Sequence, residues 1–294
     1  MASVRTWGEM IKFSHSVFAL PFALVGTVLA LRHRAPAVPV VWLGLLILIC
    51  MVSARSFAMT FNRIVDLEID RRNPRTAGRP LPAGRLTMPA AVAFTIVCGA
   101  VFVAACAGFW WVDGNLWPLG LAVPVLGYLA GYSYCKRFTS LSHFALGAAI
   151  ASAPPAAWLA IDPPSIGPAA AVLACAAALW IAGFDIIYAC QDIDVDRRDG
   201  LHSLPARVGI ARALWISRVC HLGTVGLLSA LPLFEPLGGL YWAGVACVAL
   251  LLTFEQALVR PNDLSRVNMA FFTVNGFVSL LFGAATLADV WTGP

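Results

Sequence analysis

Charged side chains are scarce in this sequence. They account for 12% of the 294 residues, whereas hydrophobic residues account for 60%. A soluble domain carries about 25% charged residues, so this composition excludes an ordinary soluble enzyme. The hydrophobic residues come in long runs, and a helix needs about 20 such residues to cross the hydrocarbon core of a bilayer. The sequence therefore predicts an all-α integral membrane protein that lies in the lipid bilayer.

Paired cysteines and clustered histidines are missing as well. The chain has eight cysteines, none of them in a Cys-x-x-Cys pair, and they lie in or at the ends of the hydrophobic runs. This pattern indicates neither a disulfide framework nor a thiolate metal site. His143 and the other histidines show no ligand spacing, and we expect them to be structural.

The hydrophobic runs predict nine transmembrane helices. The first run has the full length of a span and lacks a small-residue cleavage site, so it predicts a membrane anchor rather than a cleaved signal peptide. The expected spans are residues 13–31, 35–54, 87–112, 114–135, 138–161, 163–184, 213–234, 236–254 and 267–288.

The lysines and arginines predict the orientation of these spans. With the N-terminus in the cytoplasm, only Arg32 and Arg34 of the twenty Lys and Arg residues fall in an outside loop, which agrees with the positive-inside rule. We therefore expect a multi-pass protein of the cytoplasmic (inner) membrane with a cytoplasmic N-terminus. The net charge of +5 reflects this topology, and we expect no nucleic-acid partner.

Two similar stretches hold many of the few charges. Residues 66–84 read DLEIDRRNPRTAGRPLPAG and residues 192–209 read DIDVDRRDGLHSLPARVG. Each follows a span that is expected to run from outside to inside, so both stretches should lie on the cytoplasmic side. Their similarity suggests an internal pseudo-repeat of spans 1–4 and 5–8 within a single transmembrane domain over residues 1–294.

The acids in these stretches have helical spacing. Asn62, Asp66 and Asp70 stand four residues apart, and so do Asp192 and Asp196, so each set lies on one helix face. Carboxylates at this spacing repel each other without a cation, and Mg²⁺ prefers carboxylates together with water and substrate phosphates. The pattern predicts two clusters that hold Mg²⁺ and a diphosphate. The alternative is that these acids are solvated loop charges and helix caps.

Two further polar residues lie deeper in the spans. Arg55 precedes Asn62 by seven residues, and Asp185 precedes Asp192 by seven, so each lies about two turns deeper on the same helix face. An ionisable side chain inside a membrane is costly and normally faces a partner or a wet cavity. Arg55 and Asp185 could therefore contact substrate directly, or they could form a structural pair with each other.

Four motifs, in order and spacing, resemble those of the UbiA-type intramembrane aromatic prenyltransferases. RSFAMTFNRIVDLEID resembles the first signature of that family, DIIYACQDIDVD the second, YSYCK its Tyr-x-x-x-Lys motif, and RTAGRPLPAG its Arg-Pro-Leu loop. They stand at residues 55–70, 185–196, 132–136 and 75–84. The resemblance implies a nine-helix bundle with a central cavity. Arg63 departs from the pattern, because the family commonly has an Asp there.

The resemblance also implies roles for individual residues. The residues implied to bind Mg²⁺ are Asn62, Asp66, Asp70, Asp192 and Asp196. Those implied to contact the diphosphate or to stabilise its departure are Lys12, Arg55, Arg79, Tyr132 and Lys136. Asp185 and Tyr188 match the family pattern as polar pocket residues without an assigned role.

The activity implied by the resemblance is the transfer of a polyprenyl group from an allylic diphosphate to a hydroxylated aromatic acid. The active site would open to the cytoplasmic side, and no obligate protein partner is expected. The segments NPRTAGRPLPAG, DIIYACQD and GLHSLPARVG look most like the branch that makes menaquinone by the futalosine route, whose acceptor is 1,4-dihydroxy-6-naphthoate. The alternative acceptor is 4-hydroxybenzoate, in ubiquinone synthesis.

A function of another class also fits part of the pattern. A multi-pass transporter of an anionic substrate could use an internal repeat and charges at the inner mouth. Transporters, however, place their charged sites near the midplane of the bilayer, whereas the acids here collect at one end of the spans.

Overall fold

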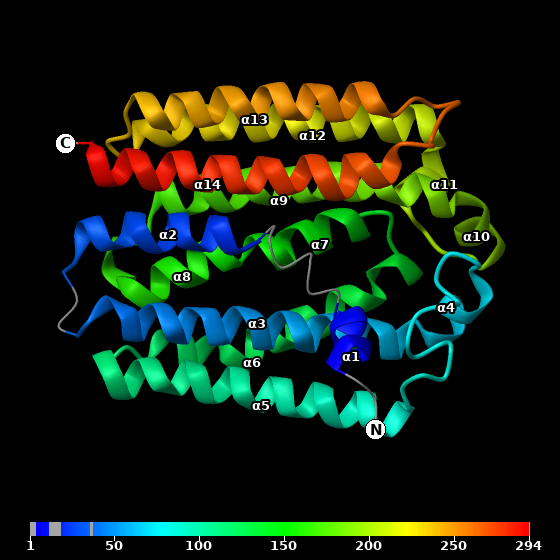
Figure 1. Cartoon of the computed structure of the whole chain (residues 1–294), viewed down its shortest axis with the longest axis horizontal. Coiled ribbons are helices and arrows are strands. Elements are labelled where there is room, and N and C mark those ends of the chain that lie inside the picture. The colour runs from blue at the N-terminus through cyan, green and yellow to red at the C-terminus, as the bar shows by residue number, and fades with distance from the viewer. Residues whose placement is uncertain (1–3, 12–18, 36–37, 294) are drawn as a thin grey trace. The chain divides into compact units, whose positions relative to one another are not determined.

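The computed structural model describes residues 4–11, 19–35 and 38–293. These residues are almost entirely helical (Figure 1). They contain no β-strand, and a single isolated bridge joins Arg260 and Asp263. The prediction of an all-α protein is confirmed.

Each of the nine predicted spans contains a helix in the described part of the chain. Seven helical segments there are long and apolar enough to cross a membrane. They are Val40–Val65, Met88–Asp113, Ser142–Ile161, Pro168–Arg198, Ile210–Leu233, Gly239–Leu258 and Met269–Thr292. The helices α2 (Ala19–His33) and α6 (Trp117–Gly131) have only 15 residues each. Nine spans and a cytoplasmic N-terminus therefore stay predictions.

The helices group into two compact units. In the first unit the helices are α1 (Val4–Ile11), α3 (Val40–Val65), α4 (Leu67–Arg72), α5 (Met88–Asp113) and α6 (Trp117–Gly131). In the second they are α2 (Ala19–His33), α7 (Ser142–Ala151), α8 (Ala153–Ile161), α9 (Pro168–Ala189), α10 (Ile193–Arg198), α11 (Leu204–Val208), α12 (Ile210–Ala230), α13 (Gly239–Leu258) and α14 (Asn275–Thr292).

Short helical turns of other kinds extend several of these helices. The 3₁₀ helices are η2 (Tyr132–Arg137), η3 (Pro163–Ser165), η4 (Cys190–Asp192) and η5 (Leu231–Leu233), and η6 (Met269–Val274) is a π-helix. A π-helical turn leaves backbone groups without their usual i to i+4 partners. The Asn275 side chain donates to the backbone oxygens of Ala270 and Phe271, which satisfies two of them.

The helix ends follow from local sequence. Helix α5 begins after Thr87, whose hydroxyl accepts a hydrogen bond from the Ala90 backbone, and Pro89 stands in its first turn. It ends at Gly114, which has a φ of +70°, a conformation that glycine adopts without strain. Helices α7 and α8 are separate because Pro154 and Pro155 lack the backbone donors that a continuous helix would need.

In the first unit, α3 packs along α5, and α5 packs on α6 (Figure 1). Helix α1 contacts α3, and its Met10 lies in a buried cluster with Leu81, Leu86 and Ala91. Arg85 donates a 2.6 Å hydrogen bond to the Glu9 carboxylate, and this bond lowers the pKa of Glu9. The first helix is thereby tied to the loop that follows α4.

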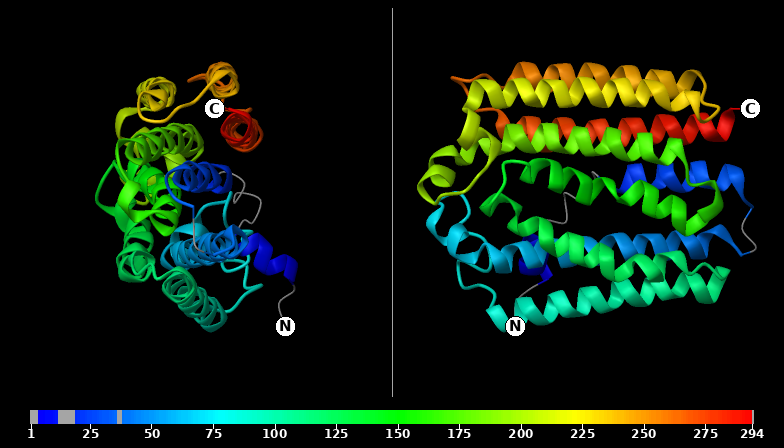
Figure 2. Two further views of the ribbon diagram at one scale, coloured as in Figure 1. Left: turned by 90° about the vertical axis from the view of Figure 1, so that its left-hand side faces the viewer. Right: turned by 180° about the vertical axis from the view of Figure 1, so that it is seen from behind.

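In the second unit, α9 is the central helix. It contacts α7 and α12, while α13 packs on α14 and α2 packs on both α8 and α14 (Figures 1 and 2). Trp180 on α9 is fully buried and stacks on Phe22. The short helices α10 and α11 lie at one end of these long helices (Figure 1).

Small residues allow close contacts between helices in this unit. A Cβ atom built on Gly147 of α7 would lie 2.4 Å from the carbonyl oxygen of Ala178 on α9. Close backbone approach at small residues is typical of helix packing in membranes. The α7–α9 contact therefore depends on the absence of a side chain at position 147.

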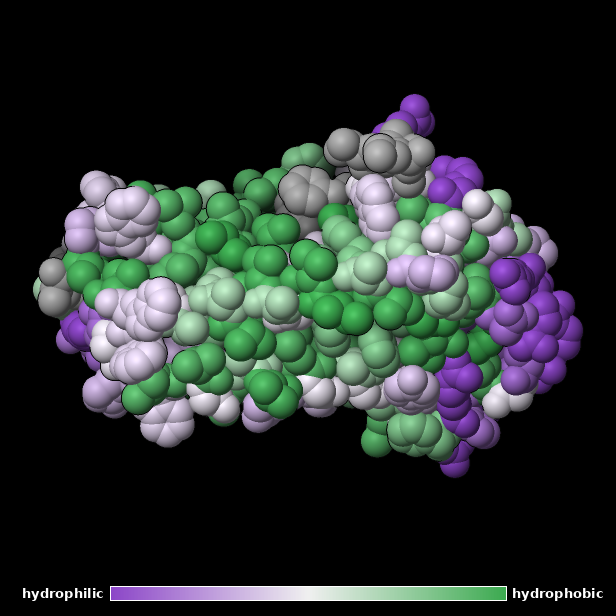
Figure 3. Space-filling view, turned by 90° about the horizontal axis from the view of Figure 1, so that it is seen from below, coloured by the Kyte–Doolittle hydropathy of each residue, from purple (hydrophilic) through white to green (hydrophobic). Residues whose placement is uncertain are grey.

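Large hydrophobic side chains cover much of the surface. Trp111, Val123, Leu222 and Leu250 are each more than two-thirds exposed. Figure 3 shows hydrophobic residues across the middle of one face and hydrophilic residues gathered at one end. Such a surface is stable only against lipid, so the chain is a multi-pass membrane protein.

We expect Gly147→Ala to destabilise the second unit. The added methyl group must push α7 away from Ala178, and overpacking of this kind costs about 1–3 kcal/mol. Thermal unfolding in detergent measures the loss. Gly226→Ala on α12 is the matched control, because a Cβ atom there meets nothing within 4 Å. Equal unfolding temperatures for the two variants would contradict the packing argument.

Candidate functional site

The first acidic stretch forms one continuous helical face, as its spacing predicts. The backbone N–H of Asp66 donates to Asn62 at 2.9 Å, and that of Asp70 donates to Asp66 at 2.8 Å. The Asn62 amide also donates to the Asp66 carboxylate at 3.2 Å. Both aspartates are buried, with 2% of Asp66 and 5% of Asp70 exposed. Two of the three predicted oxygen ligands therefore touch each other.

Asp70 pairs with two arginines. Arg79 donates to both carboxylate oxygens of Asp70, at 2.7 and 2.8 Å. Nη1 of Arg63 lies 3.8 Å from Oδ2 of the same carboxylate. The Thr76 hydroxyl donates to the Asp70 backbone oxygen at 2.9 Å, which holds the following loop on α4. The structure thus brings predicted residues Asp70 and Arg79 together. Arg63, to which the sequence analysis assigned no role, places a second cation beside them.

Arg55 lies deeper on α3, as predicted. Its Nε is buried without a hydrogen-bond partner among the described residues. Tyr132, at the start of η2, is close enough to interact electrostatically with both Arg55 and Arg63. A buried cation with an unsatisfied donor is ready to bind an anion. Arg55, Arg63 and Arg79 therefore place three cations, and Tyr132 a phenol group, near the first acidic stretch in the first unit.

The second acidic stretch gathers a similar set of groups. Asp192 ends η4 and Asp196 lies on α10. Asp196 accepts a hydrogen bond from the Ser203 hydroxyl and interacts electrostatically with Asp192, Lys136 and His143. The structure therefore places the predicted cation Lys136 beside the predicted pair of acids.

Asp185 has a partner far away in the sequence. Its Oδ2 lies 2.6 Å from Nδ1 of His143, so Asp185 has a partner other than the Arg55 considered from the sequence. His143 stands 42 residues earlier on α7, and only the packing of α7 on α9 brings it to Asp185. The sequence contained no signal for this contact, because it depends on how α7 packs on α9.

Tyr188 lies one turn beyond Asp185 on α9 and packs on aromatic rings. Its ring centroid is 4.2 Å from that of Phe271 and 6.1 Å from that of Phe272. Both phenylalanines belong to the π-helix η6. No motif indicated them, because the contact depends on a distant segment of the chain. Lys12, the remaining predicted site residue, lies outside the described residues.

The donor set fits Mg²⁺ only in part. Among the residues that the structure describes, no three His, Cys, Asp or Glu side chains lie close enough to hold an ion alone. Mg²⁺ in proteins usually takes one or two carboxylates and completes its shell with water and substrate phosphates. The like-charged pair Asp192 and Asp196 suits that chemistry. Arg79 donates to both oxygens of Asp70, so a metal ion at Asp70 would compete with Arg79 for the same carboxylate.

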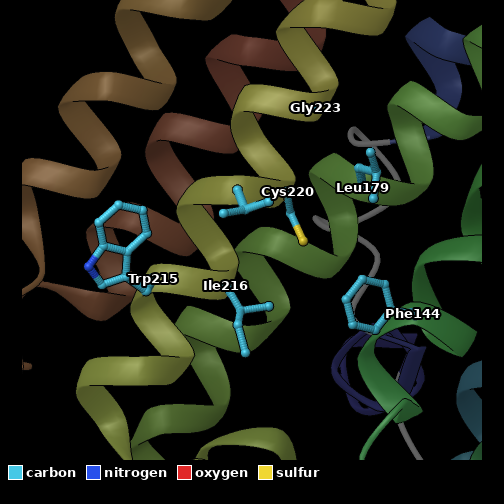
Figure 4. Close-up of a pocket in the computed structure, with 7 residues that line it drawn as sticks. Phe144, Leu179, Trp215, Ile216, Cys220 and Gly223 are labelled. Atoms are coloured by element: carbon cyan, nitrogen blue, oxygen red, sulfur yellow. The ribbon is translucent and has the colours of Figure 1, made fainter.

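A separate apolar groove lies on the second unit (Figure 4). It encloses about 560 Å³ between α7, α9 and α12, and its surface is almost entirely apolar. Its lining residues are Phe144, Leu179, Trp215, Ile216, Val219, Cys220 and Gly223. None of the predicted site residues lines this groove, so we do not place the functional site there.

Comparison with known proteins identifies the family. Residues 19–281 match the UbiA prenyltransferase family. The chain belongs to this family. It is 27% identical over 98% of its length to 98% of the 4-hydroxybenzoate octaprenyltransferase of Vibrio cholerae. The UbiA chain is therefore an enzyme that transfers a prenyl group to an aromatic acceptor, and the transporter interpretation is not supported.

Solved structures agree with this membership. The apo structure of a UbiA homologue from Aeropyrum pernix K1 is 33% identical, with a TM-score of 0.82 over 94% of this chain and 98% of that one. A UbiA homologue from Archaeoglobus fulgidus, solved with GPP and Mg²⁺, is 19% identical and has a TM-score of 0.74 over 98% of this chain and all of that one. The latter likeness shows a shared fold.

We expect Asp70→Asn to lower the stability of this UbiA protein. The substitution leaves Arg79 and Arg63 without their buried counter-charge, and removal of one partner from a buried pair costs about 3–5 kcal/mol. Thermal unfolding in detergent, without substrate, measures the effect.

The double variant Asp70→Asn with Arg79→Gln should recover part of the loss, because it removes the uncompensated charge as well. Glu68→Gln is the control, since the Glu68–Arg71 pair on α4 is exposed and exposed pairs contribute little. A double variant that loses the sum of the two single losses would contradict the coupling.

Proposed function

We propose that this enzyme transfers a polyprenyl group from an allylic diphosphate to a hydroxylated aromatic acid, with Mg²⁺, at the cytoplasmic side of the inner membrane. The observation that carries the proposal is the repeated arrangement of buried or half-buried acids beside cations. Asp66 and Asp70 lie near Arg63 and Arg79. Asp196 interacts electrostatically with Lys136. Acids and cations together suit a diphosphate and its metal ions.

In this proposal the oxygen ligands of Mg²⁺ are Asn62, Asp66, Asp70, Asp192 and Asp196. When bound, Mg²⁺ would offset negative charge on the diphosphate oxygens. The Archaeoglobus homologue solved with GPP and Mg²⁺ supports this choice of ion.

The cations of the chain would bind the diphosphate itself. Arg55, Arg79 and Lys136 offer charge-assisted donors, and Tyr132 offers a hydroxyl group. Lys12 is proposed to join them. Arg79 would exchange its bonds with Asp70 for bonds to a diphosphate oxygen.

The reaction follows from this charge distribution. The allylic carbon–oxygen bond breaks, and the cations stabilise the negative charge that develops on the departing diphosphate. The electron-rich ring of the acceptor then forms a carbon–carbon bond with the allylic cation, and the attacked ring carbon releases its proton. A membrane enzyme suits this donor, because each CH₂ group of the polyprenyl tail gains about 0.8 kcal/mol in an apolar environment.

The acceptor we propose first is 4-hydroxybenzoate. The name of the Vibrio relative, which matches this chain over nearly its whole length, supports that choice. The second candidate is 1,4-dihydroxy-6-naphthoate. The amino-acid sequences of segments 73–84, 185–192 and 200–209 support it, because they resemble the branch that uses this acceptor. The whole of residues 1–294 is proposed to act as one transmembrane domain.

We expect Asp66→Asn and Asp192→Asn each to abolish Mg²⁺-dependent turnover while the protein stays folded in detergent. Each substitution removes a charge from one acidic cluster and keeps the shape of the side chain. Product formation from geranyl diphosphate measures the loss. The controls are Glu68→Gln and Asp194→Asn, which change exposed acids next to the two clusters. Full activity in either cluster variant would reject the two-cluster site.

A competition assay tests the acceptor. Purified enzyme, Mg²⁺ and geranyl diphosphate are incubated with 4-hydroxybenzoate and 1,4-dihydroxy-6-naphthoate at equal concentrations, and the product is identified by mass. We expect prenylated 4-hydroxybenzoate to predominate. Prenylated naphthoate as the main product would assign the enzyme to the second candidate instead.

A further inference from the structure

His143 joins two segments of the second unit at the predicted site. Its Nδ1 lies 2.6 Å from Asp185 on α9, and its Nε2 accepts a 3.3 Å hydrogen bond from the backbone N–H of Leu204 at the start of α11. The ring is buried, with only 5% of the residue exposed. Both ring nitrogens are therefore committed to protein partners.

The Leu204 contact determines the tautomer of the ring. A backbone N–H can only donate, so Nε2 of His143 must carry a lone pair. In neutral histidine the proton then resides on Nδ1, which donates to Oδ2 of Asp185. This bond fixes the orientation of the carboxylate, as a carboxylate–histidine pair does in many enzyme sites.

The second oxygen of Asp185 remains available. The described residues give Asp185 one hydrogen bond, to His143 through Oδ2, and 21% of its side chain is exposed. Asp185 lies two turns before Asp192 on the same helix face, with Tyr188 between them. An exposed carboxylate oxygen accepts hydrogen bonds and repels a diphosphate. Among the groups of the two proposed substrates, the hydroxyl of the aromatic acid is the one that can donate a hydrogen bond to it.

We propose that Oδ1 of Asp185 accepts a hydrogen bond from the hydroxyl group of the aromatic acceptor, and that His143 is the positioning residue for Asp185. This inference rests on the proposed function, because it assumes a hydroxylated aromatic acceptor. It assigns a contact for the reacting ring: a hydrogen bond from the hydroxyl to a carboxylate increases the electron density that the ring offers to the allylic cation.

The same histidine also links this contact to the acidic stretch. Leu204 follows Ser203, whose hydroxyl bonds Asp196, and the Ser203 hydroxyl also accepts from the Ala206 backbone at the start of α11. His143 thereby holds Asp185 and the partner of Asp196 at a fixed separation. We expect a substitution of His143 to weaken binding of the acceptor at Asp185 before it affects the acidic stretch.

The test compares two ligands that differ by the hydroxyl group. Binding of 4-hydroxybenzoate and of benzoate is measured by calorimetry on the full-length protein in detergent, with Mg²⁺ and the unreactive donor analogue geranyl S-thiolodiphosphate. In Asp185→Asn, His143 claims the amide oxygen and leaves the NH₂ group toward the ligand. We expect the Kd of 4-hydroxybenzoate to rise about ten- to a hundredfold, the effect of a lost hydrogen bond to a charged group. The Kd of benzoate should change less than twofold.

Two conservative variants distinguish the two hydrogen bonds of His143, to Asp185 and to the Leu204 backbone. The amide of His143→Asn reaches the Nδ1 position and keeps a donor for Asp185, whereas that of His143→Gln reaches the Nε2 position and keeps the Leu204 contact. We expect His143→Asn to bind 4-hydroxybenzoate within threefold of the unaltered protein and His143→Gln to bind it at least tenfold more weakly. His202→Asn, at an exposed histidine, is the matched control.

Three outcomes overturn the inference. They are an equal loss of 4-hydroxybenzoate and benzoate binding in Asp185→Asn, a loss confined to the donor analogue, and an equal effect of His143→Asn and His143→Gln. If a His143 variant fails to fold, the comparison of the two ligands on Asp185→Asn still decides the hydroxyl contact. Binding does not require turnover. An enzyme that binds the hydroxyl group through Asp185 but makes no prenylated 4-hydroxybenzoate would refute the proposed acceptor and leave this contact standing.

Discussion

The low dielectric of the bilayer is the constraint on which the rest of this structure depends. A chain with 12% charged residues cannot place an ionisable group in a membrane span without a partner or water. The buried Asp70 and the half-buried Asp185 accordingly have specific neighbours, Arg79 and His143 respectively. The same cost that forces these groups to pair also makes them strong ligands for a substrate that arrives with opposite charge.

The sequence predicted the parts of this enzyme that are local. Hydrophobic runs gave the positions of the helices, and the four-residue spacing of Asn62, Asp66 and Asp70 predicted their common face, because helical periodicity connects near neighbours in the chain. The break between α7 and α8 at Pro154 was missed, since run length alone does not distinguish one helix from two.

Contacts between distant segments could not be predicted in this way. His143 is 42 residues from Asp185, and Phe271 is about eighty residues from Tyr188. Each meeting depends on which helices pack together and on the local π-helical turn that aims Phe271. The motif resemblance identified Asp185 and Tyr188 without roles, because a motif records residue types and not the neighbours that orient them.

The packing of α2 on α14 has a consequence for the biosynthesis of this protein. Helix α2 is synthesised well before α14, which covers one of its sides and follows about 240 residues later in the chain. At a synthesis rate of about 5–20 residues per second, that side of α2 waits tens of seconds in the membrane. A chain truncated before α14 would therefore keep most of its spans but leave the α14-facing sides of α2 and α13 uncovered. Insertion factors and membrane proteases could then bind these sides.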